Sequence, residues 1–562
     1  MRGYVAFLFD PDDERALGLA QPIEVHLNRA FGQPRVRQPG IVAWASSDLD
    51  VTTGESGVLV GQVFGDTGQA LSQEPEEGAQ RLCRQAWGRY VAIWRDGSVL
   101  RSPLGFIDVF TWERDGLQVV SSAAPPCLDK SLPAATRIDT VAVARFLRRE
   151  PQAFGLSPLI GVHTVAAGAV FRNGRNRQVW RWESFCRPGN VPGALAPDAL
   201  RDRIDHCITS WAGRFQNFGC EVSGGLDSAI VADSLVRAGA RPRLTVNYHE
   251  DTRGADERRY VADLARKRDL VITYVAKLAE PFNVQVLESA AQGLRPATAG
   301  LDAASDADLA HRLAEAGADA VFGGQGGDAV FYQMPSPLIG ADPLFGEGRK
   351  DALALWADLA RWQGSTVWSV VGAVAGSLWA DGGKLADAGS PLTMDTRRWR
   401  RRAPGGITPA KALQGDALYN SQAFLGPCRR AEAAALIHPL LSQPIVEHCL
   451  AIPASLLTGG TRDRALVREA FKTSLPASIV ERKSKGLLSS YYARHVAANA
   501  GVIGQYLATG RLVQMELVDP AAVRAMLEPG QMIQRADLSV LLTFSLMEAW
   551  VRVWEGRLAA RR

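Results

Sequence analysis

Two glycine-rich stretches of the sequence place a carboxylate beside groups that could bind an anion. Residues 223–228 read SGGLDS and residues 321–331 read VFGGQGGDAVF, and apolar residues typical of a buried strand precede each set of glycines. A strand that leads through glycines into a helix presents backbone N–H groups that can hold phosphate oxygens. A carboxylate beside phosphates, as Asp227 and Asp328 would be, requires a cation between them, and Mg²⁺ combines few carboxylates with phosphate oxygens and water. The two stretches therefore predict a site for Mg²⁺ and pyrophosphate.

This prediction assigns roles to individual residues. Asp227 and Asp328 are expected to hold the metal and to take part in catalysis. The sequence of the first stretch lacks both the GxGxxG spacing and the lysine of a GxxxxGK[ST] loop, so positive charge must come from elsewhere. Alone, SGG could be an ordinary surface turn and the second stretch a flexible hairpin, but the matched pair favours a binding site. The residues expected to bind ATP or pyrophosphate are Ser223, Gly224, Gly225, Leu226, Asp227, Ser228, Val246, Asn247, Gly323, Gly324, Gln325 and Gly326.

The surrounding sequence predicts two parts with different architectures. Up to about residue 185, short alternating runs such as SGVLVGQVFG and GRYVAIWRDG indicate strands separated by turns. Beyond a segment rich in Pro and Gly, strands alternate with helices, which favours a parallel sheet with helices on both faces. Both glycine stretches would then emerge at the carboxyl edge of that sheet. We place domains at residues 1–190 and 191–562, the second ending in mostly helical sequence.

Composition indicates a soluble cytoplasmic protein. The hydrophobic fraction is 47%, the charged fraction is 22%, and a net charge of +4 gives no argument for nucleic acid. Seven scattered cysteines without a CxxC pair indicate reduced thiols. The N-terminus does not resemble a signal peptide, and STVWSVVGAVAGSLWA is expected to be a buried helix and not a membrane span. The basic run of residues 395–406 could bind phosphates, although a solvated loop is the commoner role of such a run.

The two stretches together resemble a known family. SGGLDS is similar to the pyrophosphate loop of ATP pyrophosphatases, and its combination with GGQGGD resembles the synthetase domain of class B asparagine synthetases. VLVGQVFG, GRYVAIWRDG and RSPLG resemble their glutamine amidotransferase domain. The resemblance implies an α+β N-terminal sandwich of the Ntn amidotransferase type. An α/β ATP-pyrophosphatase domain of the adenine nucleotide α-hydrolase kind would follow, with a largely helical C-terminal part and with ATP and Mg²⁺ as ligands.

The catalytic lysine implied by this resemblance lies in RKSKG, residues 482–486. Lys485, just before a glycine, is the first candidate, and Lys483 is the second because the spacing differs by one from the commoner RxKxG. A solvated lysine without a role is the alternative for either residue. The general base is not evident; His438 and Glu432 are weak candidates, and Gln325 can only form hydrogen bonds where related synthetases often have Glu.

Position 2 departs from the family pattern. A glutaminase of this kind needs a cysteine as its first residue after removal of Met, but the sequence has Arg2, and the first cysteine along the chain is Cys83. The resemblance therefore implies a degenerate amidotransferase domain. The stretch AALIHPLLSQ also lacks the acidic and arginine residues of the family, which makes binding of free aspartate doubtful.

Among the branches without glutaminase activity, a proteobacterial lasso peptide cyclase is the one that the motifs GGQGGDAVF, RDRALVREAF and SKGLLSSYY resemble most. Such an enzyme would adenylate an Asp or Glu side chain of a leader-free core peptide and let its N-terminal amine attack. The expected partners are the precursor peptide, the leader-removing protease and a leader-recognition protein, with no nucleic acid and no membrane insertion. A synthetase that forms a small amide or β-lactam is the alternative, and a non-enzymatic binding protein is disfavoured because both aspartates and a candidate lysine are present.

Overall fold

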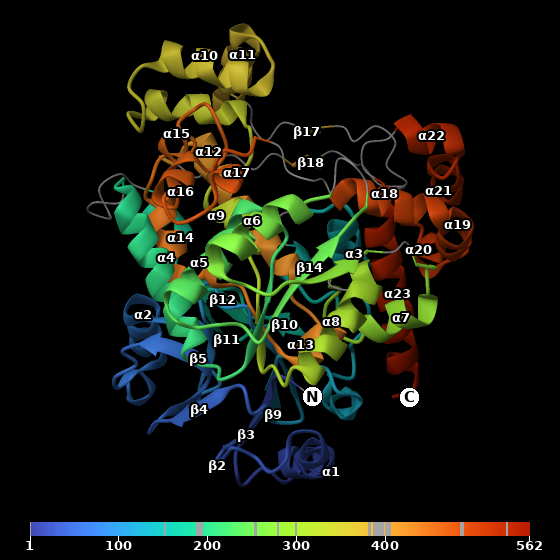
Figure 1. Cartoon of the computed structure of the whole chain (residues 1–562). Coiled ribbons are helices and arrows are strands. Elements are labelled where there is room, and N and C mark those ends of the chain that lie inside the picture. Colours follow the sequence, from blue (N-terminus) through green and yellow to red (C-terminus); the bar gives the residue numbers. More distant parts are fainter. Residues whose placement is uncertain are drawn as a thin grey trace.

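The computed structural model describes residues 2–150, 153–186, 195–251, 256–277, 280–297, 301–379, 384–385, 398–399, 406–483, 488–534 and 538–561. Figure 1 shows antiparallel sheets at the bottom, a parallel sheet in the middle, and helices at the top and the right. Both the N-terminal alternation of strands and turns and the later alternation of strands and helices are confirmed. The expected domain boundary near residue 190 falls within residues 187–194, outside the described residues, and stays a prediction.

Two six-stranded sheets form the N-terminal part, in the orders β10-β8-β9-β1-β3-β2 and β12-β11-β7-β6-β5-β4. All their strand pairs are antiparallel, and buried residues of both sheets form a shared core. The strands are β1 Tyr4–Leu8, β2 Val36–Gln38, β3 Ile41–Ala45, β4 Asp50–Thr53, β5 Gly57–Gly65, β6 Ala86–Trp94, β7 Val99–Arg101, β8 Phe110–Arg114, β9 Leu117–Ser121, β10 His163–Thr164, β11 Ala169–Arg172 and β12 Arg175–Gln178. The helices are α1 Glu14–Phe31, η1 Ala70–Ser72, α2 Pro75–Gln85, η2 Pro126–Ser131, α3 Thr140–Leu147, η3 Ala153–Gly155 and η4 Trp182–Phe185.

A five-stranded parallel sheet of order β15-β14-β13-β16-β19 forms the centre of the molecule. Its strands are β13 Phe218–Glu221, β14 Leu244–His249, β15 Thr273–Ala276, β16 Ala320–Phe322 and β19 Ala435–Ile437. The accompanying helices are α4 Pro197–Ala212, α5 Leu226–Arg237, α6 Arg258–Arg268, α7 Val284–Ala290, α8 Ala303–Glu315 and α9 Gly327–Val330. The chain adds β14 and β15 on one side of β13, then β16 and β19 on the other, so the strand order reverses between β13 and β16. Ligands of open α/β sheets bind at such a reversal.

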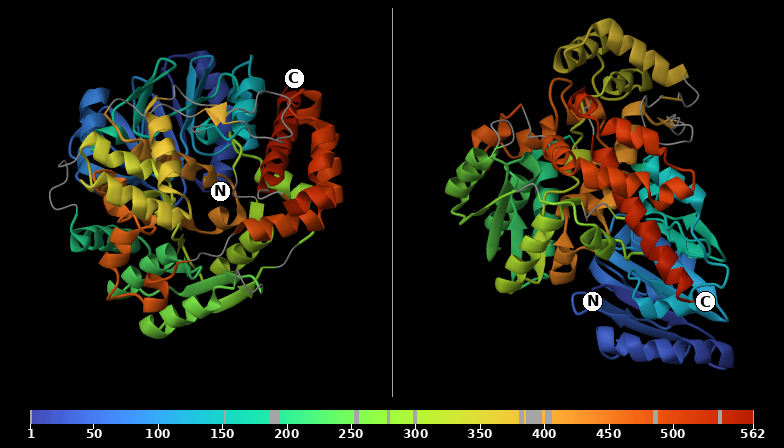
Figure 2. Two further views of the ribbon diagram at one scale, coloured as in Figure 1. Left: turned by 90° about the horizontal axis from the view of Figure 1, so that it is seen from above. Right: turned by 90° about the vertical axis from the view of Figure 1, so that its right-hand side faces the viewer.

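The remainder of the chain is mostly helical, as expected from its sequence (Figures 1 and 2). Its elements are η6 Pro337–Phe345, α10 Ala352–Gln363, α11 Val367–Trp379, β17 Lys384–Leu385, β18 Arg398–Trp399, α12 Pro409–Asn420, η7 Ser421–Phe424, α13 Arg429–Ala433, η8 Pro439–Leu441, α14 Gln443–Leu450, α15 Ala454–Leu457, α16 Ala465–Ala470, α17 Ala477–Val480, α18 Leu488–Ala498, α19 Ala500–Ala508, α20 Arg511–Gln514, α21 Pro520–Met526, α22 Pro529–Gln534 and α23 Ser539–Ala559. Among the described residues, no helix has the length and apolar character needed to cross a bilayer. Most of the basic run 395–406 lies outside the described residues.

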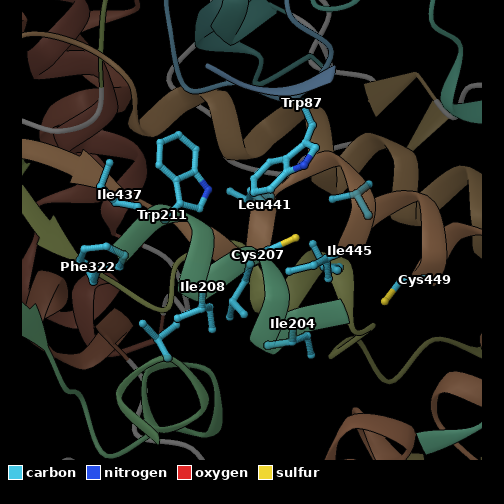
Figure 3. Close-up of a cluster of buried hydrophobic side chains, with 14 of the residues drawn as sticks. Trp87, Ile204, Cys207, Ile208, Trp211, Phe322, Ile437, Leu441, Ile445 and Cys449 are labelled. Atoms are coloured by element: carbon cyan, nitrogen blue, oxygen red, sulfur yellow. The ribbon is translucent and has the colours of Figure 1, made fainter. Parts of the chain in front are cut away.

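One hydrophobic cluster joins the N-terminal sheets to the parallel-sheet region (Figure 3). Trp87 of β6 lies 6.1 Å from Trp211 of α4, ring centre to ring centre, and Leu441 and Ile445 belong to the same cluster. Burying large aromatic side chains contributes a few kcal/mol each, roughly 1.5–3. This continuity holds the two parts of the chain in a fixed relation.

The expected buried helix is only half buried. In α11 Val370 and Val374 are buried, but Trp368 is 82% exposed. The helix packs against α10 and η6 along one side and protrudes with α10 at the top of Figure 1. The prediction of a buried helix was therefore wrong for the side of α11 that carries Trp368, because α10 and η6 cover only the opposite side.

Candidate functional site

The first glycine stretch forms a tight turn between β13 and α5. Gly225 caps the N-terminus of α5, which begins at Leu226. The Gly225 N–H donates to Ser223 Oγ at 3.3 Å, and the Ser223 N–H donates to Ser228 Oγ at 3.1 Å. Gly224 has a φ of +81°, which favours glycine. The first N–H groups of α5 therefore lie at the carboxyl edge of the sheet, as an anion site requires.

The second glycine stretch touches the first. A Cβ on Gly324 would lie 2.3 Å from the backbone nitrogen of Ser228, and one on Gly327 would lie 2.6 Å from Asp227 Cγ. A side chain at Gly324 or Gly327 would prevent the second turn from approaching the first this closely. The predicted meeting of the two loops at one sheet edge is confirmed by the parallel pairing of β13 with β16. The two loops thus bring their glycines and the first N–H groups of α5 together at this edge of the sheet.

Arg464 lies between the two predicted metal ligands. Its Nη1 donates to Asp227 Oδ2 at 2.7 Å and to Asp328 Oδ1 at 2.8 Å, and its Nε donates to Asp463 at 2.7 Å. The Arg464 side chain is 4% exposed, whereas Asp328 is 49% exposed. Burial by itself would lower the pKa of Arg464, but the three carboxylates raise it. Asp227 and Asp328 are thus brought close enough to share one cation.

Sequence reasoning missed Arg464. It lies in the segment RDRALVREAF, residues 462–471, which carries three arginines before and within α16. Arg464 adopts a left-handed φ of 52° as the N-cap residue of α16, and Arg468 of the same helix pairs with Asp463 at 3.0 Å. A dense alternation of arginine and aspartate was the available signal.

Arg482, the first residue of the RKSKG segment, lies beside the first glycine turn. This side chain pairs with Glu257 at 2.5 Å, donates to the Gly224 carbonyl at 3.2 Å and lies 4.1 Å from the Tyr260 ring centre. Lys483 follows directly and is exposed, while Lys485 falls within residues 484–487, outside the described residues. Arg482 is therefore the described residue of RKSKG that contacts the first glycine turn, and the catalytic role of either lysine stays a prediction.

The strand residues expected near adenine are buried. Val246 packs in the hydrophobic cluster beneath the sheet, and Asn247 Nδ2 donates to the Val222 carbonyl at 2.7 Å. Their side chains therefore fix the pairing of β13 with β14, and contact with a nucleotide would fall to backbone atoms. Leu226 is also buried, and Gly323, Gln325 and Gly326 lie in the second turn.

Neither weak candidate for the base is suited to that role. Burial, reinforced by Arg430 and Arg89, lowers the pKa of His438 to about 3, and its ring stacks edge-on at 5.0 Å against Phe106 of the N-terminal part. Glu432 lies on the surface, and its carbonyl accepts from Arg2 Nε at 3.1 Å.

The pocket around Arg2 is filled by a charge network. Arg2 Nη2 donates to the Ala433 carbonyl at 2.9 Å, and its Nη1 lies 3.4 Å from Asp48. Arg89 pairs with the same carboxylate at 3.0 Å and donates to Gln62 at 2.5 Å. Burial would raise the pKa of Asp48, but Arg89, Ser46 and Arg2 outweigh burial and lower it.

The cysteine that comes first in the sequence offers no replacement nucleophile. Cys83 is buried in α2, and burial together with Glu447 raises the pKa of its thiol to about 12. A thiol in such surroundings stays protonated and inert.

Comparison with known proteins agrees with the geometry. No match was found among curated proteins. The family model described as asparagine synthase matches residues 199–552, more than half of the chain, and spans both glycine turns and Arg464. The chain belongs to the asparagine synthase family.

Proposed function

We propose that the chain forms a macrolactam in lasso peptide biosynthesis. An Asp or Glu side chain of a leader-free core peptide attacks the α-phosphate of ATP, and pyrophosphate leaves. The N-terminal α-amine of the same peptide then attacks the activated carboxyl, closing the ring and releasing AMP. The observation that carries the ATP-dependent part is the pair Asp227 and Asp328, bridged by Arg464 beside two glycine turns. Membership of the asparagine synthase family supports an ATP-dependent amide-forming ligase.

Different groups of the chain stabilise the negative charges that develop in this reaction. The N–H groups at the start of α5 and the hydroxyls of Ser223 and Ser228 bind pyrophosphate. Asp227 and Asp328 hold Mg²⁺, which neutralises the phosphate oxygens when it is bound. Lys485, or Lys483 in its place, stabilises negative charge on the α-phosphate or on the tetrahedral oxyanion.

The attacking amine comes from the peptide because the N-terminal part is a degenerate amidotransferase domain. Arg2 stands where a cysteine would be needed, and its guanidinium contacts Asp48 and the Ala433 carbonyl. Cys83 is buried with a raised thiol pKa. Without ammonia from glutamine, an amine within the substrate is the simplest nucleophile. The domain division near residue 190 belongs to this proposal.

The cellular setting follows from this chemistry. The enzyme acts in the cytoplasm on a precursor peptide from which a protease has removed the leader, after a leader-recognition protein has delivered it. A freshly released, unfolded peptide is short-lived, so physical association with that protease is expected.

Mass spectrometry of a co-expression tests the proposal. The wild type, Asp227→Ala and Asp198→Ala are each combined with the neighbouring precursor gene and protease. Asp198 is the matched control because it also lies in the first turn of a helix, α4, but is exposed. Loss of one water from the released peptide in the wild type and in Asp198→Ala, but not in Asp227→Ala, is expected. A peptide that stays linear while a small acid is amidated would overturn the macrolactam and favour a small-molecule amide or β-lactam synthetase.

A further inference from the structure

The β11–β12 hairpin ends one N-terminal sheet with an open edge. Its turn, Asn173–Gly174, has positive φ at both residues, as a tight two-residue hairpin requires. β12 is the terminal strand of its sheet and pairs only with β11 within the described part of the chain. Its first three residues are exposed. An exposed edge strand offers unpaired N–H and C=O groups to another extended chain.

Two grooves run beside this hairpin and join. One, of about 520 Å³, lies between the start of α2 and the hairpin, and the other, of about 380 Å³, continues toward η4 and Glu447 of α14. Arg177 and Val179 line both grooves, so they form one continuous trough. We call it the arginine trough after the side chains that line it, Arg84, Arg172, Arg175, Arg177 and Arg181.

The trough carries more positive charge than its own acids neutralise. Arg177 pairs with Glu76, and Arg172 pairs with Asp96 at 3.0 Å. Glu447 accepts hydrogen bonds from Trp180 and Gln443, and burial raises its pKa.

Three of the five arginines of the trough have no acidic partner among the described residues. Within the described residues, no carboxylate lies at ion-pair distance from Arg84, Arg175 or Arg181. A polyanion could use these guanidinium groups, which bind carboxylates in two-pronged fashion.

The walls favour a peptide over a nucleic acid. Val179, which is partly exposed, supplies an apolar contact suited to amino-acid side chains, whereas Val170 is buried. Of the two aromatic residues that line the trough, Trp180 is buried, and Phe185 is partly buried with its ring centre 5.7 Å from that of Trp180, so neither offers a fully exposed ring face for a base to stack on. Single-stranded nucleic acids depend on such stacking platforms.

We propose that the arginine trough docks an acidic peptide segment that adds to β12 as an extended strand. Arg175, Arg177 and Val179 alternate along the chain and therefore share one face. A neighbouring strand presents every second side chain on that face, so the segment carries acids at alternate positions. This docking role goes beyond the ligase chemistry and gives the N-terminal part a function without a glutaminase.

Fluorescence anisotropy tests this docking. The probes are a labelled peptide with glutamate at alternate positions, the same peptide with glutamine, and a labelled single-stranded oligonucleotide. Binding of the glutamate peptide, weakened by salt and about tenfold or more by Arg175→Glu with Arg181→Glu, is expected. The matched control reverses Arg29 and Arg524, exposed arginines on α1 and α21, and should leave binding unchanged.

Three outcomes would overturn the proposal. They are no binding by the wild type, equal weakening in the control pair, and tighter binding of the oligonucleotide than of the glutamate peptide. Methylation of alternate amide nitrogens of the peptide separates strand addition from charge alone, because it removes the N–H donors and leaves the carboxylates. Only one of the two alternating sets of N–H groups would face β12, so methylation of that set alone should abolish binding. Affinity retained after methylation of each set in turn would contradict the added strand.

Discussion

Aspartates meet arginines in two regions of this molecule, with opposite results. At the carboxyl edge of the parallel sheet, Arg464 forms ion pairs with Asp227, Asp328 and Asp463, and the side chain of Asp328 is half exposed. In the N-terminal pocket, one carboxylate, Asp48, lies between two arginines, and all three side chains are mostly buried.

The balance of charge explains the contrast. At the sheet edge three carboxylates, Asp227, Asp328 and Asp463, pair with two arginines, Arg464 and Arg468, so carboxylates are in excess, which is the balance that the proposed Mg²⁺ site requires. In the N-terminal pocket arginines outnumber the carboxylate, and the two guanidiniums also bond to Gln62 and to backbone carbonyls. Aspartate and arginine thus form the proposed binding site at the sheet edge, whereas in the N-terminal part they form a buried ion-pair network that stabilises the structure.

The largest effect is expected from Asp328→Asn, which removes a negative charge at the carboxyl edge of the parallel sheet. The rate of ATP–pyrophosphate exchange should fall by about 100-fold or more, because the metal loses a ligand where phosphate charge develops. The Mg²⁺ concentration for half-maximal rate should rise. Asp358→Asn is the matched control, since Asp358 is likewise paired with arginine, here Arg349 and Arg361, but lies on α10 and outside the two glycine turns. An unchanged Mg²⁺ requirement in Asp328→Asn would end the assignment of the metal.

Arg464→Met should reveal the repulsion that Arg464 suppresses. Removing one partner from a buried ion pair costs roughly 3–5 kcal/mol, here because Asp227 and Asp328 would face each other without a cation. Thermal unfolding should show a lower midpoint, and Mg²⁺ should raise that midpoint more in the variant than in the wild type. Arg464→Lys, which keeps the charge, should lose less stability. If Mg²⁺ raised both midpoints equally, the two aspartates would not share a cation site.

The sequence predicted one of these regions far better than the other. The two glycine turns could be located because strand, glycine and aspartate follow one another within a dozen residues, and parallel pairing brings such turns together. Arg464 lies well over a hundred residues from either turn, and no local pattern specifies that contact. The sequence showed that position 2 lacks a cysteine. It could not show that the Arg2 guanidinium donates hydrogen bonds to backbone carbonyls more than four hundred residues away.

Arg2→Cys tests whether a thiol at residue 2 restores glutaminase activity to the N-terminal part. In a chain processed to begin at residue 2, a thiol would stand at the position that a glutaminase uses. We expect no release of glutamate from glutamine, because Arg89, Asp48 and Gln62 still fill the pocket. The free energy of unfolding should fall by about 1–3 kcal/mol through loss of charge-assisted hydrogen bonds. Arg15→Cys on α1 controls for the new thiol, and glutamate release by Arg2→Cys alone would show that the pocket is open.

The smallest effect concerns His438, which lies between the two regions, against Phe106 on one side and near Gly323 on the other. Its folded-state pKa, lowered to about 3 by burial and by Arg430 and Arg89, is below the ordinary value of about 6.5 for an unfolded chain. The unfolded state therefore binds more protons between these values, and stability falls as the pH drops from about 6.5 toward 3. In His438→Gln this part of the pH dependence should disappear, while activity near neutral pH should persist because a base of such low pKa is not the proton acceptor. Urea unfolding midpoints across this pH range measure the effect, and an identical slope in the variant would show that His438 is accessible to protons in the folded protein, so that the junction between the two regions is open and not sealed.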